Sequence, residues 1–175
     1  MFHLDMHVDA DFCGLFRQED DRDPNSVRSR MGHVTTLGGW PIVWKSSLLT
    51  RICTSTLEAE HTALSTSLKT FLPLRWLIDE IVERTKADKL HQVNVHATVF
   101  EDNQSTCYLA TNQRITNRTR HMLNSYHWFW SHVNDEETGG FNIVKCPSSE
   151  MKADYLTKPL PRAAFEHNRE LVQGW

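Results

Sequence analysis

The stretch Thr54-Ser55-Thr56-Leu57-Glu58-Ala59-Glu60-His61-Thr62-Ala63-Leu64 predicts the first turns of a long helix. Ser55 followed three residues later by Glu58 is a capping box, in which each of the two side chains satisfies a free backbone N–H. The apolar residues around it recur at spacings of three and four, at Leu57, Leu64, Leu68 and Phe71. Glu60 falls on that apolar stripe, where a buried carboxylate must be paired, protonated or bound to a metal.

Glu58 and Glu60 cannot share one role, because residues two apart on a helix point to nearly opposite sides. We expect Glu58 to serve the helix cap at the Ser55 backbone and to face away from any functional site. Glu60 should instead meet a partner contributed by another part of the chain.

The composition is that of a globular chain without a strong charge bias. Its 175 residues suit one domain with a sizeable core, and the formal net charge of −3 excludes a global basic field that would recruit nucleic acid. The sequence contains no C-x-x-C pair, no signal peptide and no apolar run long enough to span a bilayer. We expect an intracellular protein, cytoplasmic or nuclear and without membrane contact, with a domain over residues 1–160 and a C-terminal tail over residues 161–175.

Hydrophobic periodicity predicts a mixed α/β order. Three antiparallel strands come first, with Asp9 and Asp11 on the polar face of the first and Gly38-Gly39 as a hairpin turn. The long helix follows, with a kink expected near Pro73 because proline removes a backbone N–H. The expected elements are strand 4–12, a solvated loop 17–30, strands 33–37 and 40–45, helix 56–84, strand 94–100, helix 103–111, helix 118–133, strand 141–145 and a final helix from 151.

Four carboxylates stand where a strand ends or a helix begins: Asp9, Glu60, Asp102 and Asp154. Each aspartate has a plain alternative, with Asp9 solvated on an open sheet face, Asp102 as a helix N-cap and Asp154 on a helix surface. As a set the four fit a cluster that holds divalent cations, because ligands gather at the carboxyl ends of strands in open sheets. Hard oxygen ligands without thiolate or imidazole pairs favour Mg²⁺ or Mn²⁺.

Six segments, in order, resemble the ribonuclease H region of copia-type LTR retrotransposon polyproteins. They are residues 8–14, 37–46 and 55–60, the motif Glu101-Asp102-Asn103-Gln104-Ser105, the segment Arg118-Thr119-Arg120-His121 with Tyr126-His127, and residues 153–160. The resemblance covers nearly the whole chain, from about Val8 to Leu160.

This resemblance implies a ribonuclease H-like fold, with a five-stranded mixed sheet flanked by helices, and two-metal hydrolysis of the RNA strand of RNA–DNA hybrids during reverse transcription. By similarity, the family's four catalytic and metal-binding acids fall on Asp9, Glu60, Asp102 and Asp154, and two Mg²⁺ or Mn²⁺ ions are implied as cofactor. A reverse transcriptase domain upstream in the parent polyprotein is also implied. Residues 146–150 contain no counterpart of the mobile histidine that cellular ribonucleases H often carry.

The most basic local stretch, residues 114–121, is the expected contact for the hybrid backbone. Phosphate contacts there would position a duplex without reading its sequence, and the alternative is a solvated helix start. Together with the motif around Asp102, the stretch gives the expected nucleic-acid-binding set: Arg118, Arg120, His121, Asn103 and Gln104.

Two alternatives stay open at this point. A transposon-derived remnant would keep the fold and bind nucleic acid or a partner without catalysis. An integrase-type strand transferase of the same fold is disfavoured by the order of the acids, because Glu60 lies between the first and second aspartates, whereas integrases place their glutamate last.

Overall fold

A five-stranded mixed sheet forms the centre of the computed structural model, which describes residues 2–16, 20, 22–86, 94–112, 117, 119–135 and 139–174. The strands are β1 (Phe2–Asp11), β2 (Arg30–Leu37), β3 (Trp40–Leu48), β4 (Val95–Glu101) and β5 (Asn142–Lys145), in the spatial order β3-β2-β1-β4-β5. The first three are antiparallel neighbours, whereas β4 runs parallel to β1 and β5 parallel to β4. The predicted α/β class with a five-stranded mixed sheet is confirmed.

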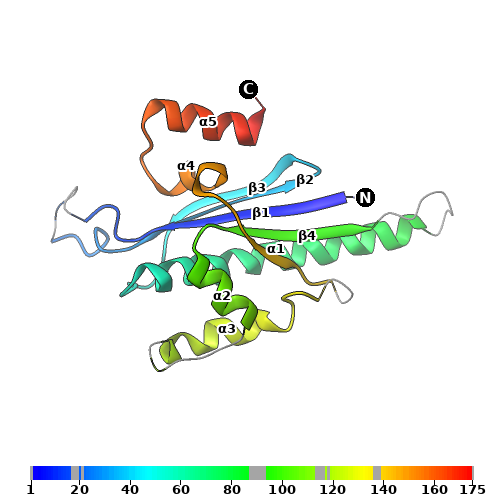
Figure 1. Ribbon diagram of the computed structural model, residues 1–175, viewed down its shortest axis with the longest axis horizontal. Coiled ribbons are helices and arrows are strands. Elements are labelled where there is room, and N and C mark those ends of the chain that lie inside the picture. Colours follow the sequence, from blue (N-terminus) through cyan, green and yellow to red (C-terminus); the bar gives the residue numbers. More distant parts are fainter. Residues whose placement is uncertain are drawn as a thin grey trace.

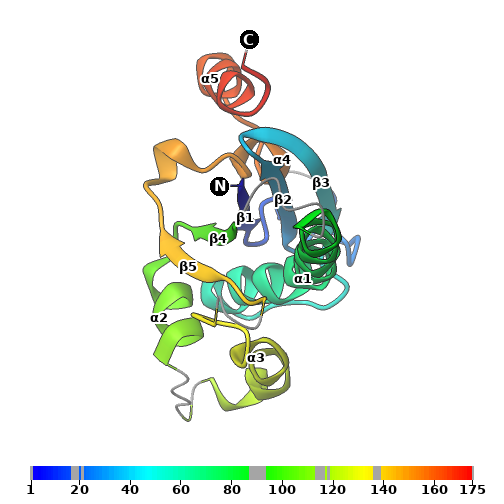
Figure 2. The ribbon, with the colours of Figure 1, turned by 90° about the vertical axis from the view of Figure 1, so that its right-hand side faces the viewer.

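Helices cover both faces of the sheet, which gives three layers (Figure 1 and Figure 2). One face carries α1 (Thr56–Lys86), α2 (Gln104–Asn112) and α3 (Leu123–Trp130), and the other carries α4 (Asp154–Thr157) and α5 (Arg162–Gln173). Two short 3-10 helices, η1 (Arg120–Met122) and η3 (Ser148–Glu150), precede α3 and α4. No helix in the described part of the chain combines the length and apolar character that crossing a bilayer requires.

The hydrophobic core lies between the sheet and α1. Met6 and Val8 of β1 are fully buried there with Leu64, Leu68 and Phe71, which belong to the apolar stripe predicted from the sequence. Each such burial contributes about 1.5–3 kcal/mol relative to an exposed side chain. The stripe fixes how α1 is rotated on the sheet, and therefore where its acidic residues point.

The polar face of β1 is covered rather than solvated. His7 and Asp9 are buried and Asp5 and Asp11 are half-buried, because α4 and the segments around it pack over this face. Burial, together with the charge of Lys152, lowers the pKa of His7 to about 3, so this imidazole is neutral. The alternative of Asp9 as a solvated residue of an open face is excluded.

The hairpin between β2 and β3 turns at Gly38-Gly39, as predicted. Both glycines have positive φ angles, 58° and 88°, which residues other than glycine adopt only with strain. The turn sets the register in which Leu37 pairs with Trp40.

The helices after residue 102 differ from the sequence expectations. Asp102 does not cap α2; the Asn103 side chain does, because its Oδ1 accepts the backbone N–H groups of Ser105 and Thr106 at 2.9 and 3.2 Å. The expected helix 118–133 is shorter, with η1 followed by α3 at residues 123–130, and a left-handed residue, Asn134, follows its end.

The expected final helix from residue 151 is divided into two. Only α4, residues 154–157, forms there, because Pro159 and Pro161 cannot donate the backbone N–H that a continuing helix needs. Within the expected tail, α5 then begins and packs on α4 and β3, with the Tyr155 and Phe165 rings edge to face at 6.1 Å. The domain boundary at residue 160 stays a prediction.

Candidate active site

Three of the four predicted acids meet at one edge of the sheet. Asp9 lies near the carboxyl end of β1, Asp102 directly follows β4, and Glu60 lies in the second turn of α1. Since β1 and β4 are adjacent and parallel, their carboxyl ends share this edge, and α1 packs across β1. One carboxylate oxygen from each residue lies within 4.8 Å of the other two.

Burial and mutual repulsion disfavour full ionisation of this acidic cluster, Asp9, Glu60 and Asp102. Asp9 is 0% and Glu60 is 5% exposed. Burial raises the pKa of Glu60 to about 9, and the charges of Asp9 and then Asp102 act in the same direction. Burial also raises the pKa of Asp9, although the charge of Lys158 opposes this.

The residues present fit a divalent cation. All three are hard oxygen donors, the class of ligand that Mg²⁺ and Mn²⁺ prefer. Glu60 Oε2 is buried and has no hydrogen-bond partner in the described part of the chain, which is costly unless a cation or proton binds it. The cluster therefore offers an incompletely satisfied set of donors at the place that the sequence predicted.

Asp154, the fourth predicted acid, reaches the cluster through a lysine. The Lys158 ammonium lies 3.1 Å from Asp9 Oδ1 and 2.9 Å from Asp154 Oδ1. Burial alone would lower the pKa of Lys158, but the charges and hydrogen bonds of these two aspartates outweigh burial and raise it. Lys158 is therefore charged and bridges the two carboxylates, and Asp154 lies outside the three-residue set.

A glycine in β2 allows α4 to sit this close to Asp9. Gly32 pairs with Asp9 across β1 and β2, and a Cβ added at Gly32 would lie 2.8 Å from side-chain atoms of both Leu156 and Thr157. Because β2 offers no side chain here, the Thr157 hydroxyl donates a hydrogen bond to Asp9 Oδ2. The contact positions Asp154 and its neighbours beside the cluster.

Comparison with known proteins identifies the lineage. No protein-family model matches the chain. It is 32% identical over 166 residues to the retrovirus-related Pol polyprotein from transposon TNT 1-94 of Nicotiana tabacum, covering 95% of this chain and 11% of that polyprotein. The Pol polyprotein from transposon RE2 of Arabidopsis thaliana is 27% identical over 164 residues, which cover 94% of this chain and 10% of the polyprotein. This chain belongs with the copia-type Pol polyproteins.

Solved structures of ribonucleases H share the fold of this Pol-related domain. Ribonuclease H1 from Halobacterium salinarum superposes with a TM-score of 0.52 at 17% identity, covering 89% of this chain and 94% of the archaeal one. LC11-RNase H1, solved in complex with an RNA/DNA hybrid, gives 0.50 at 16% identity, covering 88% and 93%. The ribonuclease H-like fold implied by the sequence resemblance is confirmed.

One buried acid of the Pol-related domain, Glu101, was not among the site residues predicted from the sequence. Glu101 is 0% exposed; its Oε1 accepts the Asn103 backbone N–H at 3.1 Å, and its Oε2 has no partner among the described residues. Burial, and then the charge of Glu60, raise its pKa well above the usual range. The signal was available, because Val95, Ala97 and Val99 alternate inward along β4 and Glu101 continues that alternation.

Asp102 accepts a hydrogen bond from the segment 146–150, which contains no histidine. The Ser148 hydroxyl in η3 donates to Asp102 Oδ2 at 2.7 Å. This contact fixes one oxygen of Asp102. Short-range patterns could not predict it, because the two residues are 46 positions apart.

Glu58 serves the helix start, with one correction to the predicted capping box. Its backbone N–H donates to the Ser55 hydroxyl at 3.2 Å, as predicted. Its carboxylate accepts the backbone N–H of Thr54 at 2.8 Å rather than that of Ser55, and the Arg51 guanidinium donates to the other oxygen at 2.5 Å. Arg51 supplies a counter-charge from the loop before the helix, so the carboxylate reaches one residue further back.

The expected nucleic-acid-binding residues have different local environments where the structure describes them. Arg118, like Arg114, lies outside the described residues. Arg120 is exposed in η1, and His121 has its Nε2 3.8 Å from Glu58 Oε2. Asn103 is committed to capping α2, and Gln104 is exposed in the first turn of that helix. Their contact with nucleic acid stays a prediction.

Proposed function

We propose that this chain is a metal-dependent ribonuclease that hydrolyses the RNA strand of RNA–DNA hybrids, in the setting of retrotransposon reverse transcription. The observation that carries the proposal is the convergence of Asp9, Glu60 and Asp102 within 4.8 Å. The ribonuclease H-like fold and the kinship with Pol polyproteins support it, and one ribonuclease of this fold was solved with an RNA/DNA hybrid.

The acidic cluster would hold the cations. Asp154 would be the fourth ligand if Lys158 released its carboxylate. When bound, two Mg²⁺ or Mn²⁺ ions would supply the chemistry of water activation and of charge stabilisation at the leaving 3′-oxygen. The protein's part is to fix the donors. Thr157 holds one oxygen of Asp9, and Ser148 holds one oxygen of Asp102. Selectivity for RNA would come from contacts with the 2′-hydroxyl, which DNA lacks.

The chain spans about a tenth of the length of the curated relatives it matches. We propose that a reverse transcriptase domain precedes it in the parent polyprotein and delivers the hybrid, and that it acts inside the cell. On this proposal an isolated chain of net charge −3 binds hybrid weakly, because few basic contacts release counterions.

A cleavage assay tests the proposed function. A hybrid with labelled RNA is incubated with the chain in Mg²⁺ or Mn²⁺, beside the same sequence as a DNA duplex and beside an EDTA control. The proposal predicts metal-dependent cutting of the RNA in the hybrid and none of the DNA duplex. Hybrid binding without cleavage in saturating metal and low salt would contradict it and favour the transposon-derived remnant.

A further inference from the structure

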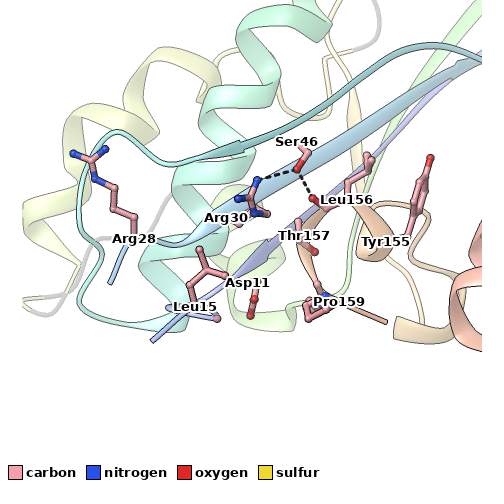
Figure 3. Close-up of a pocket in the computed structure, with 11 residues that line it drawn as sticks. Asp11, Leu15, Arg28, Arg30, Ser46, Tyr155, Leu156, Thr157 and Pro159 are labelled. Carbon is pink, nitrogen blue, oxygen red and sulfur yellow. Dashed lines mark hydrogen bonds between the residues drawn. The ribbon is translucent and has the colours of Figure 1, made fainter. Parts of the chain in front are cut away.

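A pocket of about 390 Å³ lies directly beside the acidic cluster, between the start of β2 and α4 (Figure 3). Thr157 and Lys158 belong to both places, because they line the pocket and also hydrogen-bond the two oxygens of Asp9. A ligand in this pocket therefore lies next to the carboxylates rather than at a separate site.

Two arginines line the pocket: Arg30 lies beside Ser46, and Arg28 lies at the outer edge with its guanidinium directed away from the other labelled residues (Figure 3). Arg28 and Arg30 flank the buried Ser29, and both line the pocket. Neither forms an ion pair with a carboxylate of the described residues. Arg30 is held through Ser46: its Nη1 donates to Ser46 Oγ at 3.3 Å, and that hydroxyl donates to the Leu156 carbonyl at 2.6 Å (Figure 3). Arg30 is thus hydrogen-bonded to a neutral hydroxyl rather than paired with a carboxylate, so its charge stays available.

The opposing charge in the pocket is smaller. Asp11 is the acidic residue among the described lining residues, and its carboxylate lies against Gly14, where an added Cβ would come within 1.5 Å of Oδ2. Lys158 is already engaged by Asp9 and Asp154. Two guanidinium charges against one carboxylate leave an excess of positive charge, opposite in sign to the neighbouring acidic cluster.

We propose that this pocket binds a backbone phosphate of the nucleic-acid strand that passes the acidic cluster. The inference rests on the proposed function, because it places the pocket on the path of the strand to be cut. Guanidinium groups bind phosphate oxygens through charge-assisted, often bidentate hydrogen bonds, whereas carboxylates repel phosphate. The pocket therefore supplies the local anchor that a chain of net charge −3 needs beside its acids.

This anchor differs from the basic stretch that the sequence suggested. Arg28 and Arg30 belong to the segment that was expected to be a solvated loop, and they adjoin the cluster through α4. His121 of the basic stretch instead lies near Glu58, at 3.8 Å. Nothing in the local sequence around Arg28 indicates that α4, more than 120 residues later, completes a pocket there.

Binding of a fluorescent RNA–DNA hybrid to the full chain, at several salt concentrations and with Ca²⁺ replacing Mg²⁺ to suppress cutting, tests the pocket. Arg28→Ala and Arg30→Ala should each weaken binding on the order of tenfold at low salt and reduce the salt slope by about one phosphate contact. Arg84→Ala is the matched control, because Arg84 is exposed on α1 and paired with Glu80. Arg30→Lys keeps the charge but loses the bidentate guanidinium, so its affinity for the hybrid should lie between those of wild type and Arg30→Ala.

Single methylphosphonate substitutions along each strand then locate the phosphate. The proposal predicts one or two adjacent positions where the neutral linkage weakens wild-type binding about tenfold but hardly affects Arg30→Ala, since the partner is already gone. Two results would show that the pocket is not a phosphate site. In one, each methylphosphonate weakens binding to wild type and to Arg30→Ala equally; in the other, both arginine variants bind the hybrid as tightly as Arg84→Ala does. A wild-type chain that binds no hybrid at low salt overturns the proposal as well.

These outcomes are separable from those of the cleavage assay. Cleavage with no arginine effect on binding refutes the pocket and leaves the acidic cluster in place. Coupling between Arg30 and one phosphate without cleavage keeps the pocket and refutes the enzyme. Should Arg30→Ala fail to fold in a thermal melt, Arg28→Ala and Arg30→Lys carry the same comparison.

Discussion

Glu58 and Glu60 lie two residues apart on α1 and are equally buried, with 5% of each exposed, yet their surroundings are opposite. Glu58 accepts hydrogen bonds from the backbone N–H and hydroxyl of Thr54 and from the positively charged guanidinium of Arg51. Glu60 faces Asp9 and Asp102, and its Oε2 has no hydrogen-bond partner in the described part of the chain. The difference teaches that burial of a carboxylate alone does not mark a functional site. Like charges around it do, because they create a demand for a cation.

Substitution of Glu60 gives the largest expected effect. Glu60→Gln should reduce cleavage of a labelled hybrid in Mg²⁺ by at least about 100-fold, because loss of even an outer-shell partner of a metal site costs about 10–100-fold. Its melting temperature in EDTA should stay unchanged or rise, since one repelling carboxylate is gone. Retained cleavage in this variant would break the contrast with Glu58.

Lys158→Met tests whether the lysine ammonium and a divalent cation share the same carboxylates. Without metal this variant should lose about 1–2 kcal/mol of stability, because Asp9 is fully buried and loses its counter-charge, while the one-third exposure of Lys158 limits the loss. Mn²⁺ should raise its melting temperature by more than it raises that of wild type. Equal Mn²⁺ shifts in the two proteins would show that the lysine and the ion do not share these carboxylates.

Glu58→Gln should cost stability and spare chemistry. The variant loses charge-assisted hydrogen bonds to Arg51 and Thr54, so we expect a loss of about 1–2 kcal/mol in urea unfolding. Its cleavage rate below the melting range should match that of wild type. A large loss of activity with intact stability would reverse the assignment of the two glutamates.

The two glutamates should also have opposite pH signatures, which is the smallest effect. The folded pKa of Glu60 is raised from 4.5 to about 9, so its contribution to stability is full below about pH 4.5 and is lost as pH rises towards 9. For Glu58, burial raises the pKa, but hydrogen bonds from Thr54 and the charge of Arg51 outweigh it and lower the pKa overall. Its contribution is therefore present above about pH 4.5 and lost on acidification.

Unfolding in EDTA across this pH range measures both signatures. Compared with wild type, Glu60→Gln should show a shallower loss of stability between about pH 5 and 9. The deficit of Glu58→Gln should shrink below about pH 4.5. Parallel curves for all three proteins would contradict the assigned environments.

Periodicity predicted the strands, the long helix and the position of Glu60, because strands and amphipathic helices are formed by residues that lie close together in the sequence. The stripe of Leu64, Leu68 and Phe71 is buried as expected, and Gly38-Gly39 forms the turn. Short helices were placed less well. Pro159 and Pro161 end one helix and start another within a few residues, which periodicity does not resolve.

The acids of the site were predictable, whereas the residues that hold them were not. Asp9 and Asp102 stand at strand ends, which is a local signal. Lys158 and Ser148 reach these two acids from 149 and 46 positions away, through packing that no short window of sequence contains. Glu101 was missed although the alternation along β4 points it inward.

The central claim is that the acidic cluster around Glu60 binds the divalent cation, and Mn²⁺ titration by calorimetry tests it most directly. Wild type and Glu58→Gln should bind Mn²⁺ with the same affinity, whereas Glu60→Gln should bind on the order of tenfold or more weakly. Equal Mn²⁺ affinity in wild type and Glu60→Gln would contradict the account.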